Sequence, residues 1–277
     1  DDPMFKEEIV TATLKNRPEV DVKTAADALS NDVILTPYEP GQGLPLFIQP
    51  NTPKLSDDTE YALAWLEEKR PAIEQALVSA GAVVLRGFPI DRSIHFARFT
   101  NGYGSFETGY MGGTDVRQIV VDKVLTTNVL RSDLTLDIHQ EMSYMQRFPK
   151  RIAFYCRTAP VTGGSTMLCD MREVTARMDP VLFNEVAKRG IRLVRNYLAP
   201  GSDRSHPVIG KFHKTWTEAF ETDDPAKAEA TCRGLGFDVA WREDGSLEAF
   251  YNLPGIATHP RTGEQIWFNQ ASMYAMT

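Results

Sequence analysis

His139-Gln140-Glu141 is the stretch from which the fold and the chemistry of this chain are best inferred. On an extended segment successive side chains alternate faces, so a histidine and a glutamate two positions apart point the same way. One imidazole nitrogen and one carboxylate oxygen are then offered to a single cation. They are two of the three protein ligands of the two-histidine, one-carboxylate triad, which holds non-heme Fe(II) and leaves coordination positions open. Without a metal, the pair is only a polar patch on a strand.

The size and composition of the chain are those of an ordinary globular protein. It has 277 residues and 31.0 kDa, and 42% of its residues are hydrophobic. A net charge of −7 and a pI near 5.3 argue against nucleic acid or an anionic membrane as the main partner. No apolar run has the length of a membrane helix, and the first residues are no signal peptide. The three cysteines form no C-x-x-C pair, which disfavours structural zinc and indicates a reducing, cytoplasmic setting.

Helices are predicted where capping residues precede helical spacing. Asp57 and Glu60 have capping-box spacing, and the helix that follows is interrupted or restarted at Pro71 and ends near Val78. Two further helices open with an Asp-Pro pair, and they are predicted over 179–190 and 224–233.

Strands are predicted from short apolar runs that are alternating or rich in β-branched residues. Apart from one or two peripheral strands before Thr52, they are expected over 82–85, 119–128, 134–141, 151–156 and 167–169. Asp244-Gly245 predicts a hairpin that joins 238–242 to 247–251. Many strands with a few outer helices favour a mainly β fold with flanking helices, built on a β-sandwich or jelly-roll core.

Further motifs extend the central stretch in both directions along the chain. In order, they are GAVVLRGF (81–88), HQEMSY (139–144), PKRIAFYC (149–156), GGST (163–166), HPRTGE (259–264) and WFNQ (267–270). Together they resemble the taurine/2,4-D dioxygenase family over most of residues 81–270. Within that family the chain is similar to clavaminate synthase-like proteins and to the syringomycin-type hydroxylases of amino-acid-derived metabolites. The resemblance implies a double-stranded β-helix (jelly-roll) core and dependence on Fe(II), 2-oxoglutarate and O2.

The resemblance also implies roles for individual residues. His139 and Glu141 would be metal ligands, and Thr166 would contact 2-oxoglutarate. Glutamate at the carboxylate position is similar to the clavaminate synthase and arginine hydroxylase subset. Related halogenases lack this carboxylate because chloride takes its coordination position. Glu141 therefore favours hydroxylation or desaturation of an unactivated C–H bond in a small amino-acid-like or specialised-metabolite substrate, either free or tethered to a carrier protein.

Four further residues are candidates for substrate contact, namely Tyr110, Met111, Asn128 and Tyr144. The first two lie in a Gly-Gly loop that matches a pocket-lining loop of the family, although a plain turn between strands accounts for that loop equally well. The other two flank the expected metal-bearing strand, where buried aromatic side chains usually only pack. Relatives in this family often self-associate, so a homo-oligomer stays open.

The second histidine ligand and the arginine that binds the far carboxylate of 2-oxoglutarate follow the WFNQ motif in the family. This chain ends at Thr277. We therefore expect one oxygenase domain over 1–277 that lacks a C-terminal segment of the core. The remaining histidines are expected to be structural or solvent-exposed, in a turn, in loops or on a helix: His259, His206, His213 and His95.

Two other functions stay open at this point. A non-catalytic jelly-roll protein, with a binding or regulatory role, would keep the fold without the full triad. A zinc hydrolase on a similar barrel would hold zinc and a nucleophilic water through His139 and Glu141. The sequence contains no G-x-S-x-G and no glycine-rich phosphate-binding motif.

Overall fold

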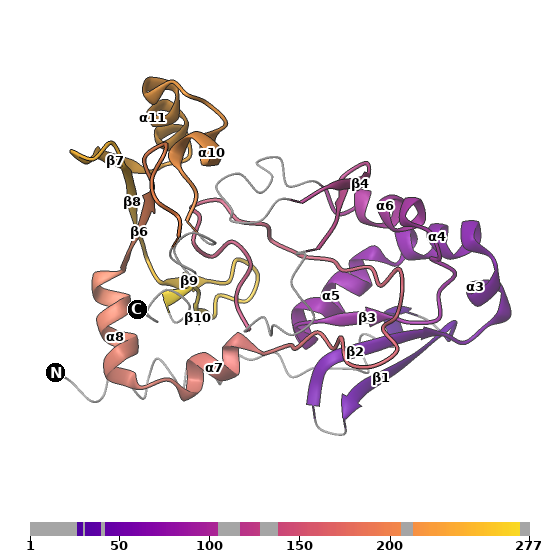
Figure 1. Cartoon of the computed structure of the whole chain (residues 1–277). Coiled ribbons are helices and arrows are strands. Elements are labelled where there is room, and N and C mark those ends of the chain that lie inside the picture. The colour runs from indigo at the N-terminus through magenta and orange to yellow at the C-terminus, as the bar shows by residue number, and fades with distance from the viewer. Residues whose placement is uncertain are drawn as a thin grey trace.

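The computed structural model describes residues 27–29, 31–39, 42–104, 117–127, 138–205 and 213–271. These residues form helices and four small β-sheets. In Figure 1, the elements up to α6 gather on one side of the molecule and those from α7 onward on the other. Within the described part of the chain, no helix is long and apolar enough to span a membrane.

The N-terminal side is a three-stranded sheet covered by helices. β1 (Val33–Glu39) pairs antiparallel with β2 (Gln42–Pro50), and β2 pairs parallel with β3 (Val83–Leu85). This confirms the peripheral strands expected before Thr52 and the strand expected over 82–85. The helices between β2 and β3, and the one that follows, are α3 (Pro53–Asp57), α4 (Thr59–Glu68), α5 (Arg70–Ala80) and α6 (Ser93–Asn101). Their apolar faces bury a core that includes Ile48, Leu55, Trp65, Leu66 and Ile73.

The cap of α4 differs by one residue from the prediction. Asp58, not Asp57, is the N-cap, and its carboxylate accepts a hydrogen bond from the Tyr61 amide at 3.0 Å. Asp57 instead ends α3. Pro71 lies in the first turn of α5, where its missing N–H costs nothing, so the predicted restart of the helix is confirmed.

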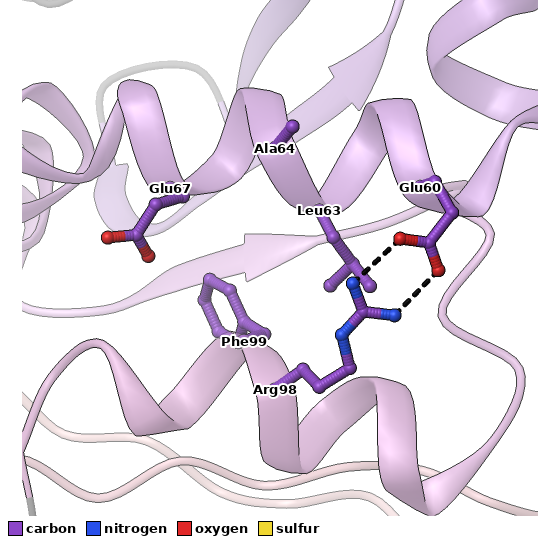
Figure 2. A pocket seen from close by; sticks show the side chains of 6 residues that line it. All are labelled: Glu60, Leu63, Ala64, Glu67, Arg98 and Phe99. Carbon is purple, nitrogen blue, oxygen red and sulfur yellow. Dashed lines mark hydrogen bonds and ion pairs between the residues drawn. The ribbon is translucent and has the colours of Figure 1, made fainter.

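Helices α4 and α6 lie side by side and are joined by an ion pair. Arg98 on α6 donates to both carboxylate oxygens of Glu60 on α4, at 2.6 and 2.7 Å (Figure 2). These hydrogen bonds hold the pKa of Glu60 below its ordinary value. Leu63 and Phe99 close a shallow hollow between the two helices.

The C-terminal side is built on an antiparallel sheet of order β6–β8–β7. Its strands are β6 (Ile191–Tyr197), β7 (Asp238–Trp241) and β8 (Leu247–Leu253), which confirms the hairpin across Asp244-Gly245. The accompanying helices are α8 (Pro180–Arg189), α10 (Trp216–Phe220) and α11 (Pro225–Gly234). Asp179 and Asp224 cap α8 and α11 through their carboxylates, as predicted. One face of the sheet packs on a second core, formed by Met142, Met145, Trp216, Phe237, Leu247 and Tyr251.

Several predicted strands are wrong. Residues 151–156 and 167–169 have no regular secondary structure, and most of their side chains are exposed. Alternating apolar and polar residues form a strand only where a neighbouring strand supplies backbone hydrogen bonds. Among the described residues, none supplies such bonds to these two segments. The single strand predicted over 119–128 is a hairpin of β4 (Ile119–Val121) and β5 (Val124–Leu125), with Asp122 at φ 51° in the turn. The expected strand over 134–141 lies largely outside the described residues, and 138–140 are irregular.

The described fold is therefore mixed, with helices and several small sheets, and it is not mainly β as expected. Figure 1 shows the two larger sheets on opposite sides of the molecule, separated by irregular segments. Residues 151–155 cross to the N-terminal side without forming a strand. Arg151 pairs with Glu74 of α5 at 2.5 Å, and Tyr155 stacks on Phe96 of α6 with ring centroids 5.3 Å apart.

A short hairpin between β9 (Ile256–Thr258) and β10 (Gln265–Trp267) carries the chain into the WFNQ motif. Its turn depends on His259, whose Nδ1 accepts a hydrogen bond from the Thr262 amide at 3.2 Å. Burial lowers the pKa of His259, which favours the neutral imidazole that this acceptor role requires. Thr262 in turn donates its hydroxyl to the buried Glu264 at 2.6 Å. His259 therefore serves the turn, as the sequence indicated.

Helix α7 (Met171–Arg177) connects the two sides of the molecule. The Thr175 hydroxyl accepts the Trp267 amide at 2.9 Å, which ties α7 to β10. On the other side, the guanidinium of Arg172 donates to the carbonyls of Val78 and Ser79, at 3.4 and 3.2 Å, in the last turn of α5. These carbonyls have no partner within their helix. The Asp170 carboxylate lies 2.9 Å from the Arg172 guanidinium and compensates its buried charge.

Replacing Arg172 by methionine should lower the free energy of unfolding by about 2–4 kcal/mol, because it leaves Asp170 and two helix carbonyls without their buried partner. Urea denaturation measures the change. Arg177→Met is the matched control, because Arg177 lies on the same helix, with its side chain 81% exposed, and pairs with Glu173. Its effect should stay within about 0.5 kcal/mol. Equal effects of the two substitutions would contradict the role assigned to Arg172.

Candidate functional site

His139 and Glu141 lie side by side, although on an irregular segment that turns at Glu141 and not on the expected strand. His139 Nε2 is 3.5 Å from Glu141 Oε2, and each side chain is only 20% exposed. Two ligand atoms that bind one cation at about 2.1 Å, at right angles to each other, lie about 3 Å apart. The observed separation is close to that value. The two donor atoms therefore fit a shared divalent cation, and their nitrogen and oxygen chemistry suits Fe(II).

The second oxygen of Glu141 has a different neighbour. Arg117, just before β4, places its Nη2 3.2 Å from Glu141 Oε1, and the Arg117 side chain is 14% exposed. This charge-assisted hydrogen bond fixes the carboxylate so that Oε2 faces the imidazole. Arg117 was not predicted from the sequence, because nothing around it relates it to a glutamate 24 residues later.

Gln140, between the two candidate ligands, attaches this segment to the WFNQ motif. Its Nε2 donates to the Trp267 carbonyl at 2.6 Å, and its Oε1 accepts the Asn269 amide at 3.1 Å. The Gln270 side chain donates to the backbone carbonyl of Gln140 at 2.7 Å. We call these three hydrogen bonds the Gln140 clamp. They join segments about 130 residues apart and use both polar atoms of the Gln140 amide.

The WFNQ side of the clamp is itself fixed by buried hydrogen bonds. The Asn269 side chain is 5% exposed and donates to the Gly255 carbonyl at 2.8 Å. The Phe268 amide donates to the same carbonyl at 3.0 Å. Gly255 has φ +74°, and a Cβ there would lie 2.5 Å from Val186, so the position requires glycine. The clamp thus rests on a rigid part of the β9–β10 hairpin.

Beyond Glu141 the chain turns into the C-terminal core. Met142 has φ 54°, in the left-handed region that non-glycine residues seldom adopt, and its side chain is 2% exposed. Together with Met145 it packs in the core under the β6–β8–β7 sheet. The burial of Met142 outweighs the cost of its backbone conformation. The candidate ligands are therefore held by polar contacts at Gln140 and by apolar contacts immediately after Glu141.

The other predicted site residues are not all brought to this pair. Thr166 is exposed in an irregular segment, and its contact with 2-oxoglutarate stays a prediction. The preceding Gly163 and Gly164 have φ +67° and +69°, and the chain bends at residues 161–162, just before the predicted Gly-Gly turn. Tyr144 packs against the C-terminal core with the Arg195 guanidinium 4.5 Å from its ring centre, so its contact with substrate also stays a prediction. Tyr110, Met111 and Asn128 lie outside the described residues.

A third metal ligand is not found in the part of the chain that the structure describes. There, no three His, Cys, Asp or Glu side chains are grouped so as to hold a metal ion. His95 lies on α6 with Nδ1 2.9 Å from Asp91, His213 is exposed, and His259 serves the hairpin turn. His206 lies outside the described residues.

Comparison with known proteins gives the site its context. Residues 45–274 match the taurine catabolism dioxygenase TauD, TfdA family. A clavaminate synthase-like protein of Arabidopsis thaliana is 29% identical over 208 residues, which are 74% of this chain and 62% of the relative. The dapdiamide synthesis protein DdaC of Enterobacter agglomerans is 27% identical over 205 residues, 74% of this chain and 59% of the relative.

The chain thus spans about three fifths of the length of these two relatives. The family match covers the His139–Glu141 pair, the Gly-Gly turn and the WFNQ motif in one continuous range. The similarity that the sequence motifs suggested is confirmed, and the chain belongs to the TauD, TfdA family of dioxygenases.

Proposed function

We propose that this chain is part of an Fe(II)- and 2-oxoglutarate-dependent dioxygenase that hydroxylates or desaturates an unactivated C–H bond of a small amino-acid-like or specialised-metabolite substrate. The observation that carries this proposal is the approach of His139 Nε2 to Glu141 Oε2 at 3.5 Å, in a member of the TauD, TfdA family. One relative is named for dapdiamide synthesis and another for its likeness to clavaminate synthase. These names support a biosynthetic substrate.

Each of the candidate residues would have a distinct role. His139 and Glu141 would hold the metal through one nitrogen and one oxygen. Arg117 would keep the carboxylate oriented by binding its other oxygen. Bound Fe(II), with 2-oxoglutarate and O2, would supply the oxidising power that protein side chains lack. The hydroxyl of Thr166 would donate to a carboxylate of 2-oxoglutarate, as the family resemblance implies.

Glu141 also bears on the choice of reaction. Its carboxylate would take the coordination position that halogenating relatives leave to chloride, which supports hydroxylation or desaturation. We further propose that the oxygenase domain has the jelly-roll core of the family. The match of residues 45–274 to the TauD, TfdA family supports this proposal.

A non-catalytic binding protein is the alternative function that one observation favours. The described residues supply two candidate ligands, and an oxygenase of this type needs three. Such a protein would bind its ligand without taking up Fe(II) at His139 and Glu141. A measurement of Fe(II) binding therefore distinguishes the oxygenase from the non-catalytic protein more directly than a search for a substrate does.

Replacing Glu141 by alanine should weaken binding of Fe(II) at least about tenfold, because the carboxylate oxygen beside His139 is lost. Anaerobic titration calorimetry measures the affinity. Subsequent addition of 2-oxoglutarate should give the visible charge-transfer band of its iron chelate in the unmodified protein only.

Glu60→Ala is the matched control for this experiment. Glu60 is also bound by an arginine through its carboxylate, but it lies on α4 and not on the segment that carries His139. Its removal should leave the affinity for Fe(II) unchanged. Equal affinity in the Glu141→Ala protein would remove the carboxylate from the site, and an unmodified protein that binds no Fe(II) would favour the non-catalytic alternative.

Replacing Gln140 by alanine should weaken Fe(II) binding by about tenfold although Gln140 is no ligand, because the clamp orients both neighbours. The variant should still fold, since Met142 and Met145 anchor the same segment in the core. Circular dichroism checks the fold, and calorimetry measures the metal affinity. Gln146→Ala removes a single hydrogen bond, from Gln146 to the Gly236 carbonyl, and should not change the affinity. An unaltered affinity in the Gln140→Ala protein would show that the clamp does not position the ligands.

A further inference from the structure

A surface groove lies at the turn end of the β7–β8 hairpin, where α10 and α11 begin. Its volume is about 610 Å³, and its lining includes Pro200, Trp216, Pro225, Trp241 and Asp244. Figure 1 shows β7, α10 and α11 together at one extremity of the molecule. None of the candidate metal or substrate residues lines this groove, so its role is separate from the proposed oxygenase chemistry.

Two tryptophans give the groove its character. Their rings are perpendicular, at 89°, with centroids 5.4 Å apart. Trp216 is 5% exposed and forms the floor, whereas Trp241 is 37% exposed and forms a wall. Both indole N–H groups are already used, by the Gly245 carbonyl at 3.2 Å and by Glu229 at 3.1 Å. Trp241 therefore offers a ligand its exposed ring surface and not its hydrogen-bond donor.

The charge around the groove is strongly negative. Residues 218–248, which supply α11 and the β7–β8 hairpin, contain nine acidic and three basic residues, while the whole chain has a net charge of −7. Among the basic residues, Arg233 pairs with Glu229, and Arg242 pairs with Glu248 and Asn196. Asp244, at the rim, is exposed and keeps the turn through Ser246 at 2.9 Å. Glu218 pairs with Arg204, from outside this range, and Asp244 is the carboxylate that lines the groove. An aromatic face beside a carboxylate favours a cation.

The prolines and the open shape of the groove bear on the kind of ligand to which the cationic group belongs. Pro200 and Pro225 present rigid, exposed apolar surfaces in the lining of the groove. Grooves lined by aromatic rings recognise extended, proline-containing chains that lose little entropy on binding. The volume also exceeds the lower end, about 300 Å³, of small-ligand sites. A chain segment fills such a groove better than a single small amine.

We propose that this groove, which we call the Trp216–Trp241 groove, binds an extended basic peptide segment of a partner protein. An arginine or lysine of the segment lies over the Trp241 ring, and its neighbouring residues pack on the prolines and on Trp216. The acidic surface of α11 and the hairpin attracts the segment and orients it.

A dye-labelled hexapeptide of alternating arginine and proline is the probe, and fluorescence anisotropy at two salt concentrations measures its binding. The unmodified chain should bind it, and Trp241→Ala should weaken binding at least about fivefold through loss of the ring. Trp241→Phe keeps an aromatic face and should retain binding to within about twofold. It also shows whether the alanine variant fails only because its fold is disturbed.

Glu243→Gln is the control for non-specific attraction. Glu243 lies in the same acidic segment but does not line the groove, so its substitution should change the affinity less than Asp244→Asn does. Absence of binding, or equal weakening by Glu243→Gln and Trp241→Ala, would overturn the proposal. If arginine amide alone binds as tightly as the hexapeptide, the groove is a small-cation site and the peptide proposal is wrong.

Discussion

The hydrogen bonds of Gln140 are the contacts on which the candidate site depends. Through them, a segment with no regular secondary structure of its own acquires a fixed position against residues 267–270. The partners of Gln140 are largely buried. Breaking these hydrogen bonds would leave buried amide and carbonyl groups unsatisfied, which is costly, so the bonds are strongly favoured. The supports continue outward, because Trp267 is held by Thr175 of α7 and α7 is held by Arg172 against α5. A displacement of Trp267, α7 or Arg172 would therefore also displace His139 and Glu141.

Much of the structure could be predicted from local sequence. The Asp-Pro openings of α8 and α11 and the Asp-Gly turn of the hairpin each depend on residues a few positions apart, and all three were predicted correctly. His139 and Glu141 were expected to meet because side chains two positions apart share a face of a strand; they do lie close together, but the segment is irregular and turns at Glu141, so strand alternation is not the cause. The family followed from the order of several such short motifs along the chain, and the match over residues 45–274 confirms it.

What the sequence did not predict depends on contacts between distant segments. Alternation at Ile152 and Phe154 resembled a strand, but a strand needs a second backbone, and no pattern within the segment says whether one is near. Arg117 reaches Glu141 across 24 residues, and Gln140 meets Trp267 across 127. Long polar side chains such as these are usually solvated. A structural role for them therefore cannot be predicted from the residue type alone. The WFNQ motif was recognised by resemblance, yet its function as a clamp becomes visible only in three dimensions.

Hydrogen–deuterium exchange, with and without Co(II) as a redox-stable divalent ion, tests most directly whether the two sides of the clamp form one metal-supporting unit. The amides of Ser143 and Asn269 report on it, because each donates to an oxygen of Gln140. Metal binding at His139 and Glu141 should slow exchange in residues 138–146 and in 265–271 together, since fixing one side fixes the other. Slower exchange confined to one segment, or to neither, would contradict this account of the site.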